Sequence, residues 1–92
     1  MPRYLIERTV PGANTLTADE LRDIATKSNA VLAGLGEPYT WEHTYVAGDK
    51  LFCVHEASGP DAIRRHAERG GFPVDSITEI SSMIGPKTGA AA

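Results

Sequence analysis

The sequence predicts an α+β sandwich in which two helices cover one face of a four-stranded antiparallel sheet. Two observations lead to this prediction. Two stretches carry apolar residues at helical spacing, and four shorter stretches alternate between apolar and polar residues as half-buried strands do. Their order along the chain is β-α-β-β-α-β, which is that of the ferredoxin-like, or split β-α-β, fold. Right-handed crossovers then place both helices on the same face of the sheet.

The first part of the chain carries clear signals for one strand and one helix. Residues 3–8 alternate as a strand, and Pro11 lies in the turn that follows. Thr17 and Glu20 have the spacing of a capping box, in which each side chain accepts a hydrogen bond from the other residue's backbone N–H. The helix is therefore expected to begin after Thr17 and to end near Gly34, because glycine favours a helix C-terminus.

The middle of the chain predicts a hairpin followed by a second helix. Residues 40–46 and 50–56 alternate as two strands, and the short turn at Gly48-Asp49 joins them. The second helix begins near Pro60, a residue that is favoured in a first helical turn. It is expected to stop at Gly70-Gly71.

The last strand is expected over residues 77–84. We therefore predict a ferredoxin-like domain at residues 1–84 and a flexible C-terminal tail at residues 85–92. A chain of 92 residues fits one domain. A domain of this size buries only about 60–65% of its extended-chain surface, so covering one sheet face with a second copy would enlarge the core. A homodimer that forms a dimeric α/β barrel is the expected assembly.

Composition excludes several classes of function. The net charge is −3, and the densest basic set, Arg64, Arg65 and Arg69, belongs to the second helix, so nucleic-acid binding has little support. No apolar run approaches the roughly 20 residues of a membrane span. Cys53 is the only cysteine, which rules out an internal disulfide and fits a reducing cytoplasm.

Alternation divides the strand residues between two faces of the sheet. The face toward the helices is expected to hold Tyr4, Ile6, Val46, Phe52, Val54, Ile80 and Ile84. The opposite face is then expected to hold Leu5, Glu7, Trp41, His43, Tyr45, Leu51, Cys53, His55, Glu79, Ser81 and Met83. Large aromatic residues on an open sheet face indicate an interface, so two such faces are expected to meet in the homodimer.

The opposite face also predicts a transition-metal site in the cavity between two sheets. Its proposed ligands are Glu7, His43, Cys53 and Glu79. Imidazole, thiolate and carboxylate together suit Ni²⁺, Zn²⁺ or Cu²⁺ better than Mg²⁺ or Ca²⁺. Trp41 and Tyr45 are expected to line the cavity as its cofactor-binding walls.

Each of these residues also has a structural interpretation. Glu7 could form an ion pair at a sheet edge, and His43 could be a hydrogen-bonded core residue. Cys53 could be a small buried apolar residue, and Glu79 a solvated acid. His66, on the second helix, could face solvent or cover neighbouring apolar side chains. A third hypothesis is therefore that the protein is purely a structural or interaction module.

Several blocks of the sequence resemble a family of small bacterial proteins long labelled a domain of unknown function. The blocks are residues 3–9, 41–46, 52–54, 62–67 and 71–80. The family includes a nickel-binding protein with a ferredoxin-like fold that forms dimers. The resemblance spans residues 2–84 and implies the fold, dimerisation and a nickel role. The chain departs from the family pattern at His55 and after Met83.

These observations predict a cytoplasmic transition-metal binding protein, with nickel as the expected ion, that acts as a homodimer. The alternative is a cofactor-free enzyme of the dimeric α/β-barrel type, a monooxygenase or isomerase. In that alternative His43 would act as a general base oriented by Glu7 or Glu79. A binding protein is favoured over an enzyme.

Overall fold

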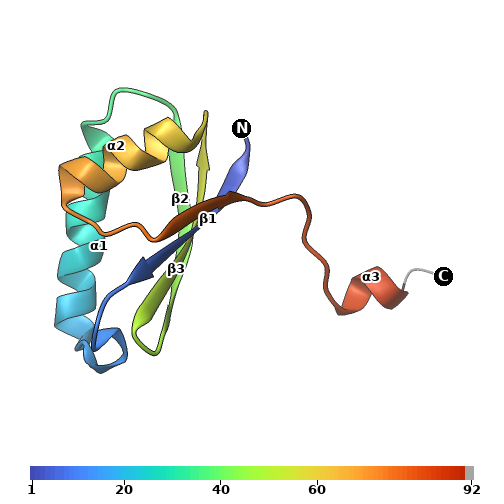
Figure 1. Cartoon of the computed structure of the whole chain (residues 1–92), viewed down its shortest axis with the longest axis horizontal. Coiled ribbons are helices and arrows are strands. Elements are labelled where there is room, and N and C mark those ends of the chain that lie inside the picture. The colour runs from blue at the N-terminus through green and yellow to red at the C-terminus, as the bar shows by residue number, and fades with distance from the viewer. Residues whose placement is uncertain (91–92) are drawn as a thin grey trace.

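The computed structural model describes residues 1–90 as a four-stranded antiparallel sheet with two helices on one face (Figure 1). The strands are β1 (Arg3–Thr9), β2 (Tyr39–Ala47), β3 (Lys50–Ala57) and β4 (Ser76–Glu79). The helices are α1 (Ala18–Ala33), α2 (Pro60–Gly70) and the short α3 (Pro86–Ala90), and a 3₁₀ turn, η1, spans Ala13–Thr15. The strand order β2-β3-β1-β4 is that of the predicted fold.

Local signals place the ends of the two long helices where the sequence predicted them. Thr17 caps α1 through a complete capping box with Glu20, at donor–acceptor distances of 3.0 and 3.2 Å. Pro60 opens α2. Gly71 ends it in the left-handed conformation, with φ of 68°, which other residues adopt at a cost.

Replacing the N-cap of α1 should lower stability measurably. Thr17→Ala removes the acceptor for the Glu20 N–H and should reduce the free energy of unfolding by about 1 kcal/mol. Urea denaturation followed by circular dichroism measures this loss. Thr26→Ala, at an exposed position inside the same helix, is the control and should cost nothing. Equal stability of Thr17→Ala and the wild type would contradict the assignment.

The hydrophobic core lies between the sheet and the two helices. It contains the buried residues Tyr4, Ile6, Ala13, Leu51, Cys53, Ala57, Ala62 and Ile63. Tyr4 and Ile6 thus face the helices as predicted. The other face of the sheet, which we call the open face, has no helix over it (Figure 1). The sheet is open rather than closed, and the structure contains one chain, so a barrel is not seen.

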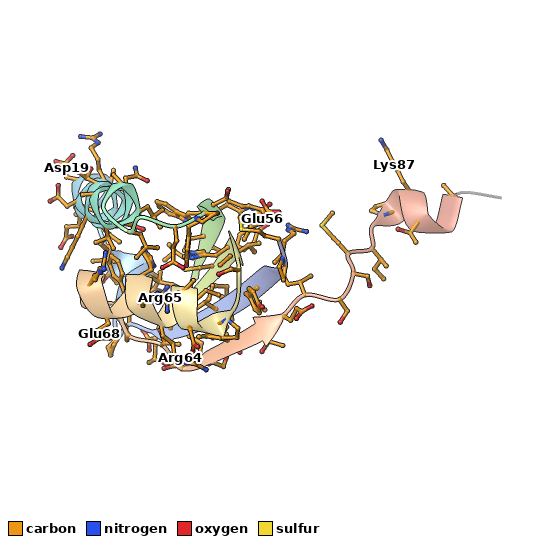
Figure 2. The ribbon with its side chains drawn as sticks, turned by 90° about the horizontal axis from the view of Figure 1, so that it is seen from above. Asp19, Glu56, Arg64, Arg65, Glu68 and Lys87 are labelled. Atoms are coloured by element: carbon orange, nitrogen blue, oxygen red, sulfur yellow. The ribbon has the colours of Figure 1, made fainter. Side chains whose placement is uncertain are left out.

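An ion pair and a hydrogen bond hold α2 against the segment at the end of α1. Arg65 forms a two-pronged pair with Glu37, at 2.8 Å for each contact, and Arg69 donates to the carbonyl oxygen of Gly34 at 3.0 Å. The hydrogen bond from Arg65 lowers the pKa of Glu37. Arg64 and Arg65 follow one another on α2 (Figure 2), and Arg64 contacts Asp61 of the same helix. These arginines have structural partners.

The C-terminal part differs from the prediction. The last strand ends at Glu79 and not at residue 84, because β4 pairs with β1 only as far as Tyr4. The chain then leaves the sheet on its open side and ends in α3 (Figure 1). Ile84, expected to face the helices, is exposed. The predicted flexible tail includes a short helix over Pro86–Ala90, and residues 91–92 of that tail lie outside the described residues.

Candidate functional site

The open face carries one exposed imidazole and one exposed phenol. His43 and Tyr45 lie on β2 with ring centroids 5.0 Å apart in an edge-on arrangement, and Tyr45 is 61% exposed. Both residues pair with the open-face residues of β3, Val54 and Phe52. None of the side-chain hydrogen bonds within residues 1–90 involves His43, so its ring nitrogens are available to a ligand.

Glu7 shares the open face with His43 but has partners of its own. Its carboxylate accepts a hydrogen bond from Ser76 Oγ at 3.0 Å and lies 3.6 Å from Lys50 Nζ. The register places Glu7 opposite Phe52, which in turn lies opposite Tyr45. Strand β3 therefore separates Glu7 from His43. No carboxylate orients His43, so the general-base arrangement of the alternative enzyme is not found among residues 1–90.

The prediction that Cys53 and Glu79 share this face is wrong. Cys53 pairs with Ile6 and is buried on the helix side of the sheet. Leu51 and His55, on the same strand, turn to the helix side with it, and Phe52 and Val54 turn to the open face. Glu79 pairs with Tyr4 at the end of β4, where it is exposed.

Trp41 also lies on the helix side, because the register of β2 shifts between Trp41 and His43. A β-bulge at this point inserts one residue, so residues on its two sides no longer follow simple alternation. Trp41 pairs with His55, and its indole N–H donates to Thr44 Oγ1 at 2.9 Å. Trp41 therefore lines a cavity on the helix side of the sheet, and the prediction that it lies on the opposite face, in a cavity between two sheets, is wrong.

That cavity has a volume of about 250 Å³ and lies between α1 and strand β2. Leu21 and Ile24 of α1 form one wall, and Trp41 and Leu51 of the sheet form another. Val46, which also lines the cavity, is exposed. The cavity is partly open to solvent, and its largely apolar lining suits a small ligand.

Two buried histidines lie on the inner side of this cavity. His55 of β3 and His66 of α2 are each 1% exposed, and their ring centroids are 5.4 Å apart. His55 Nδ1 forms a hydrogen bond with the Tyr39 hydroxyl. His66 Nε2 bonds to Ser28 Oγ at 3.1 Å, and its Nδ1 is buried without a hydrogen-bond partner within the described chain.

Burial keeps both histidines neutral. It lowers the pKa of His55 to about 3, with further contributions from His66 and from the positive charge of Arg8. Burial followed by Arg8 lowers the pKa of His66 to about 4. Burial also raises the pKa of Tyr39, so its hydroxyl stays protonated beside His55.

Phe72 completes the inner wall and depends on a neighbouring glycine. Its ring lies 5.3 Å from the His66 ring and 5.6 Å from the guanidinium carbon of Arg8. A Cβ atom at Gly70 would stand 2.2 Å from Phe72 Cε2, so a side chain there would displace the ring. The sequence signal for this cluster was the position of His66 on the apolar face of α2; nothing in the sequence indicated the roles of His55 and Arg8.

A family model for SCO4226-like nickel responsive proteins matches residues 4–80. The chain belongs to this family. The family resemblance that the sequence blocks indicated is thereby confirmed. A comparison with curated proteins finds no match.

A solved structure supports the fold of this member of the SCO4226-like family. The crystal structure of SCO4226 from Streptomyces coelicolor A3(2) aligns with a TM-score of 0.73 at 23% identity. The alignment covers 89% of this chain and 99% of the other. No helix within the described residues is long and apolar enough to cross a membrane.

The residues of this SCO4226-like chain fit a nickel ion only in part. Nickel accepts imidazole and carboxylate ligands, and His43 offers a free imidazole on the open face. Within residues 1–90, however, no three His, Cys, Asp or Glu side chains are grouped so that they could hold a metal ion. One chain by itself therefore presents separate ligands and not a complete site.

Proposed function

We propose that this protein binds nickel as a homodimer, with the ion held between the open faces of two sheets and His43 as its principal ligand. The supporting observation is the exposed, unpartnered imidazole of His43 in a chain of the nickel responsive family. A neutral imidazole is the commonest metal ligand in proteins and suits nickel.

A second copy would supply the ligands that one chain lacks. In a two-fold symmetric dimer each surface residue appears twice, so two His43 side chains and two Glu7 carboxylates would face the same space. Glu7 would exchange its contact with Lys50 for the ion. Cys53 and Glu79 are not part of this proposed site, because they lie on the helix side of the sheet.

Apolar groups on and beside the open face support the choice of a second copy as partner. Leu5 and Phe52 lie on this face, and Tyr45 is largely exposed there. Beyond β4 the chain extends on the same side of the sheet (Figure 1). Met83 and Ile84, which belong to this segment, are exposed. Seen from above, the helix α3, which carries Lys87, also lies apart from the rest of the domain (Figure 2). In the proposed dimer these residues pack against the second copy.

Removing His43 should abolish most of the nickel affinity. His43→Asn should weaken nickel binding at least about 100-fold, because each ligand of a four-ligand structural metal site contributes several kcal/mol to the free energy of binding. Calorimetric titration of untagged protein with NiCl₂ measures the change. Thr78→Ala, on the same face without a metal-binding side chain, is the matched control and should bind as the wild type does. Titrations with Zn²⁺ and Cu²⁺ test the identity of the metal.

The same samples test the dimer. Sedimentation velocity should show a dimer for the wild type and a monomer for Tyr45→Glu, which places a charge in the proposed interface. The proposal is wrong if His43→Asn binds nickel normally or if the wild type binds no nickel. Loss of nickel binding in His66→Gln, with His43→Asn unaffected, would move the site to the interior cavity.

A further inference from the structure

Arg8 places a positive charge inside the protein without a carboxylate to balance it. Its side chain lies on the helix side of β1, and the residue is 3% exposed. One guanidinium nitrogen donates to the carbonyl oxygen of Pro73 at 2.7 Å, and the group lies beside the Phe72 ring. Arg8 takes part in none of the ion pairs within residues 1–90. A buried arginine is normally paired, so this charge is unusual.

A second hydrogen-bond donor lines the same cavity as Arg8. Ser28 can donate its hydroxyl proton to His66 Nε2, and the neutral ring then carries its own proton on Nδ1. That Nδ1 is the buried polar side-chain atom of the described chain that lacks a partner. Leaving such a donor unpaired costs free energy. In this tautomer His66 and Arg8 both carry N–H groups that have no acceptor within residues 1–90, since only one guanidinium nitrogen of Arg8 is bonded, to the Pro73 carbonyl oxygen.

The remaining walls are largely apolar, which restricts the class of ligand. Leu21, Ile24 and Trp41 are among the apolar residues that line the cavity. The volume of about 250 Å³ exceeds the roughly 150 Å³ that accommodates benzene in an engineered protein cavity. A ligand with one small ring or a short chain, and one anionic group, would match both the size and the chemistry.

We propose that this cavity binds a small monocarboxylate with an apolar body. Its carboxylate accepts hydrogen bonds from Arg8, in a wall to which His66 also contributes, and its body lies between α1 and Trp41. The cavity is on the helix side of the sheet, away from the open face on which the nickel site is proposed. The two proposals are therefore independent, and the ligand acts on each protomer separately.

Two ligands that differ mainly in charge test whether the cavity prefers a carboxylate. The metal-free, full-length protein is titrated with 3-phenylpropionate and with its neutral analogue 3-phenylpropanamide, and amide NMR signals are recorded. The acid should bind at least about tenfold more tightly than the amide, because it forms charge-assisted hydrogen bonds with Arg8. Signals of the Trp41 indole and of the backbone near Leu21 should shift. Equal affinity of the two ligands, or shifts confined to the open face, would overturn the proposal.

Three variants identify the residues responsible. Arg8→Met keeps an unbranched apolar stem but removes the guanidinium, and it should remove the preference for the acid while the amide still binds. Ala25→Phe fills the cavity from α1 with Arg8 in place and should abolish binding of both ligands, so the test does not depend on the folding of Arg8→Met. Arg64→Met, at an exposed arginine, should bind both ligands as the wild type does. Full binding to Ala25→Phe, or inorganic phosphate binding as tightly as the acid, would disprove the proposed site.

Discussion

Acidification from about pH 7 to about pH 4.5 should lower the free energy of unfolding by roughly 5 kcal/mol, a large part of the stability of a small domain. The two buried histidines cause this loss. Their pKa values in the folded protein are about 3 for His55 and about 4 for His66, against about 6.5 in an unfolded chain.

The sign follows from proton uptake. Between pH 6.5 and 4 the unfolded chain binds a proton at each of these histidines and the folded chain does not. The unfolded state therefore holds more protons, and stability falls as the pH is lowered through this range. Glu37, whose pKa is lowered by Arg65, acts in the same direction at more acidic pH.

Urea denaturation of the metal-free protein at several pH values, followed by Trp41 fluorescence, measures this effect. His66→Gln keeps a hydrogen-bonding group near Ser28 and should remove about half of the pH dependence. His43→Asn, at an exposed histidine, is the control and should leave the dependence unchanged. An unfolding free energy that does not change between pH 7 and pH 4.5 would show that His55 and His66 are not buried as described.

Truncation of Ile6 should be the most damaging single change to the core. Ile6 has no exposed surface, lies on the central strand β1 and pairs with Cys53 and Ile77. Ile6→Ala should reduce the free energy of unfolding by about 2–5 kcal/mol, through lost burial and the cavity that remains. Leu5→Ala, one residue away on the open face, should cost only about 1 kcal/mol in the monomer, where Leu5 is half-buried.

Chemical denaturation of both variants at one protein concentration compares these values. The difference between them tests the orientation of β1, since neighbouring residues of a strand point to opposite faces. A larger loss for Leu5→Ala than for Ile6→Ala would reverse the two faces of the sheet. The open face would then be the core, and the proposed nickel site on it would fail.

The order of the elements was predictable because its signals are local. The capping box of Thr17 and Glu20, Pro60 in the first turn of α2 and Gly71 at its end each act within a few residues. These signals suffice to place two helices between strands, and the chirality of the crossovers then puts both helices on one face. The orientation of β1 was also correct, since Tyr4 and Ile6 are buried.

The candidate site was predicted only in part, because it depends on strand orientation. In β3 the alternating sets Leu51, Cys53, His55 and Phe52, Val54 are both largely apolar, so alternation does not show which set is buried. A shift of the strand register by one residue moves every side chain to the other face. His43 and Glu7 were assigned to the correct face, whereas Cys53 was not.

The sequence by itself determined the β-α-β-β-α-β order and the helix ends, since each depends on a few neighbouring residues. Only the tertiary structure decided that Trp41 turns inward at a bulge and that Arg8, His55 and His66 meet in one cavity. These four residues come from β2, β1, β3 and α2, and Arg8 of β1 is separated from the other three by a whole helix and its flanking turns. Their proximity results from strand register and helix packing, which are collective properties of the whole fold.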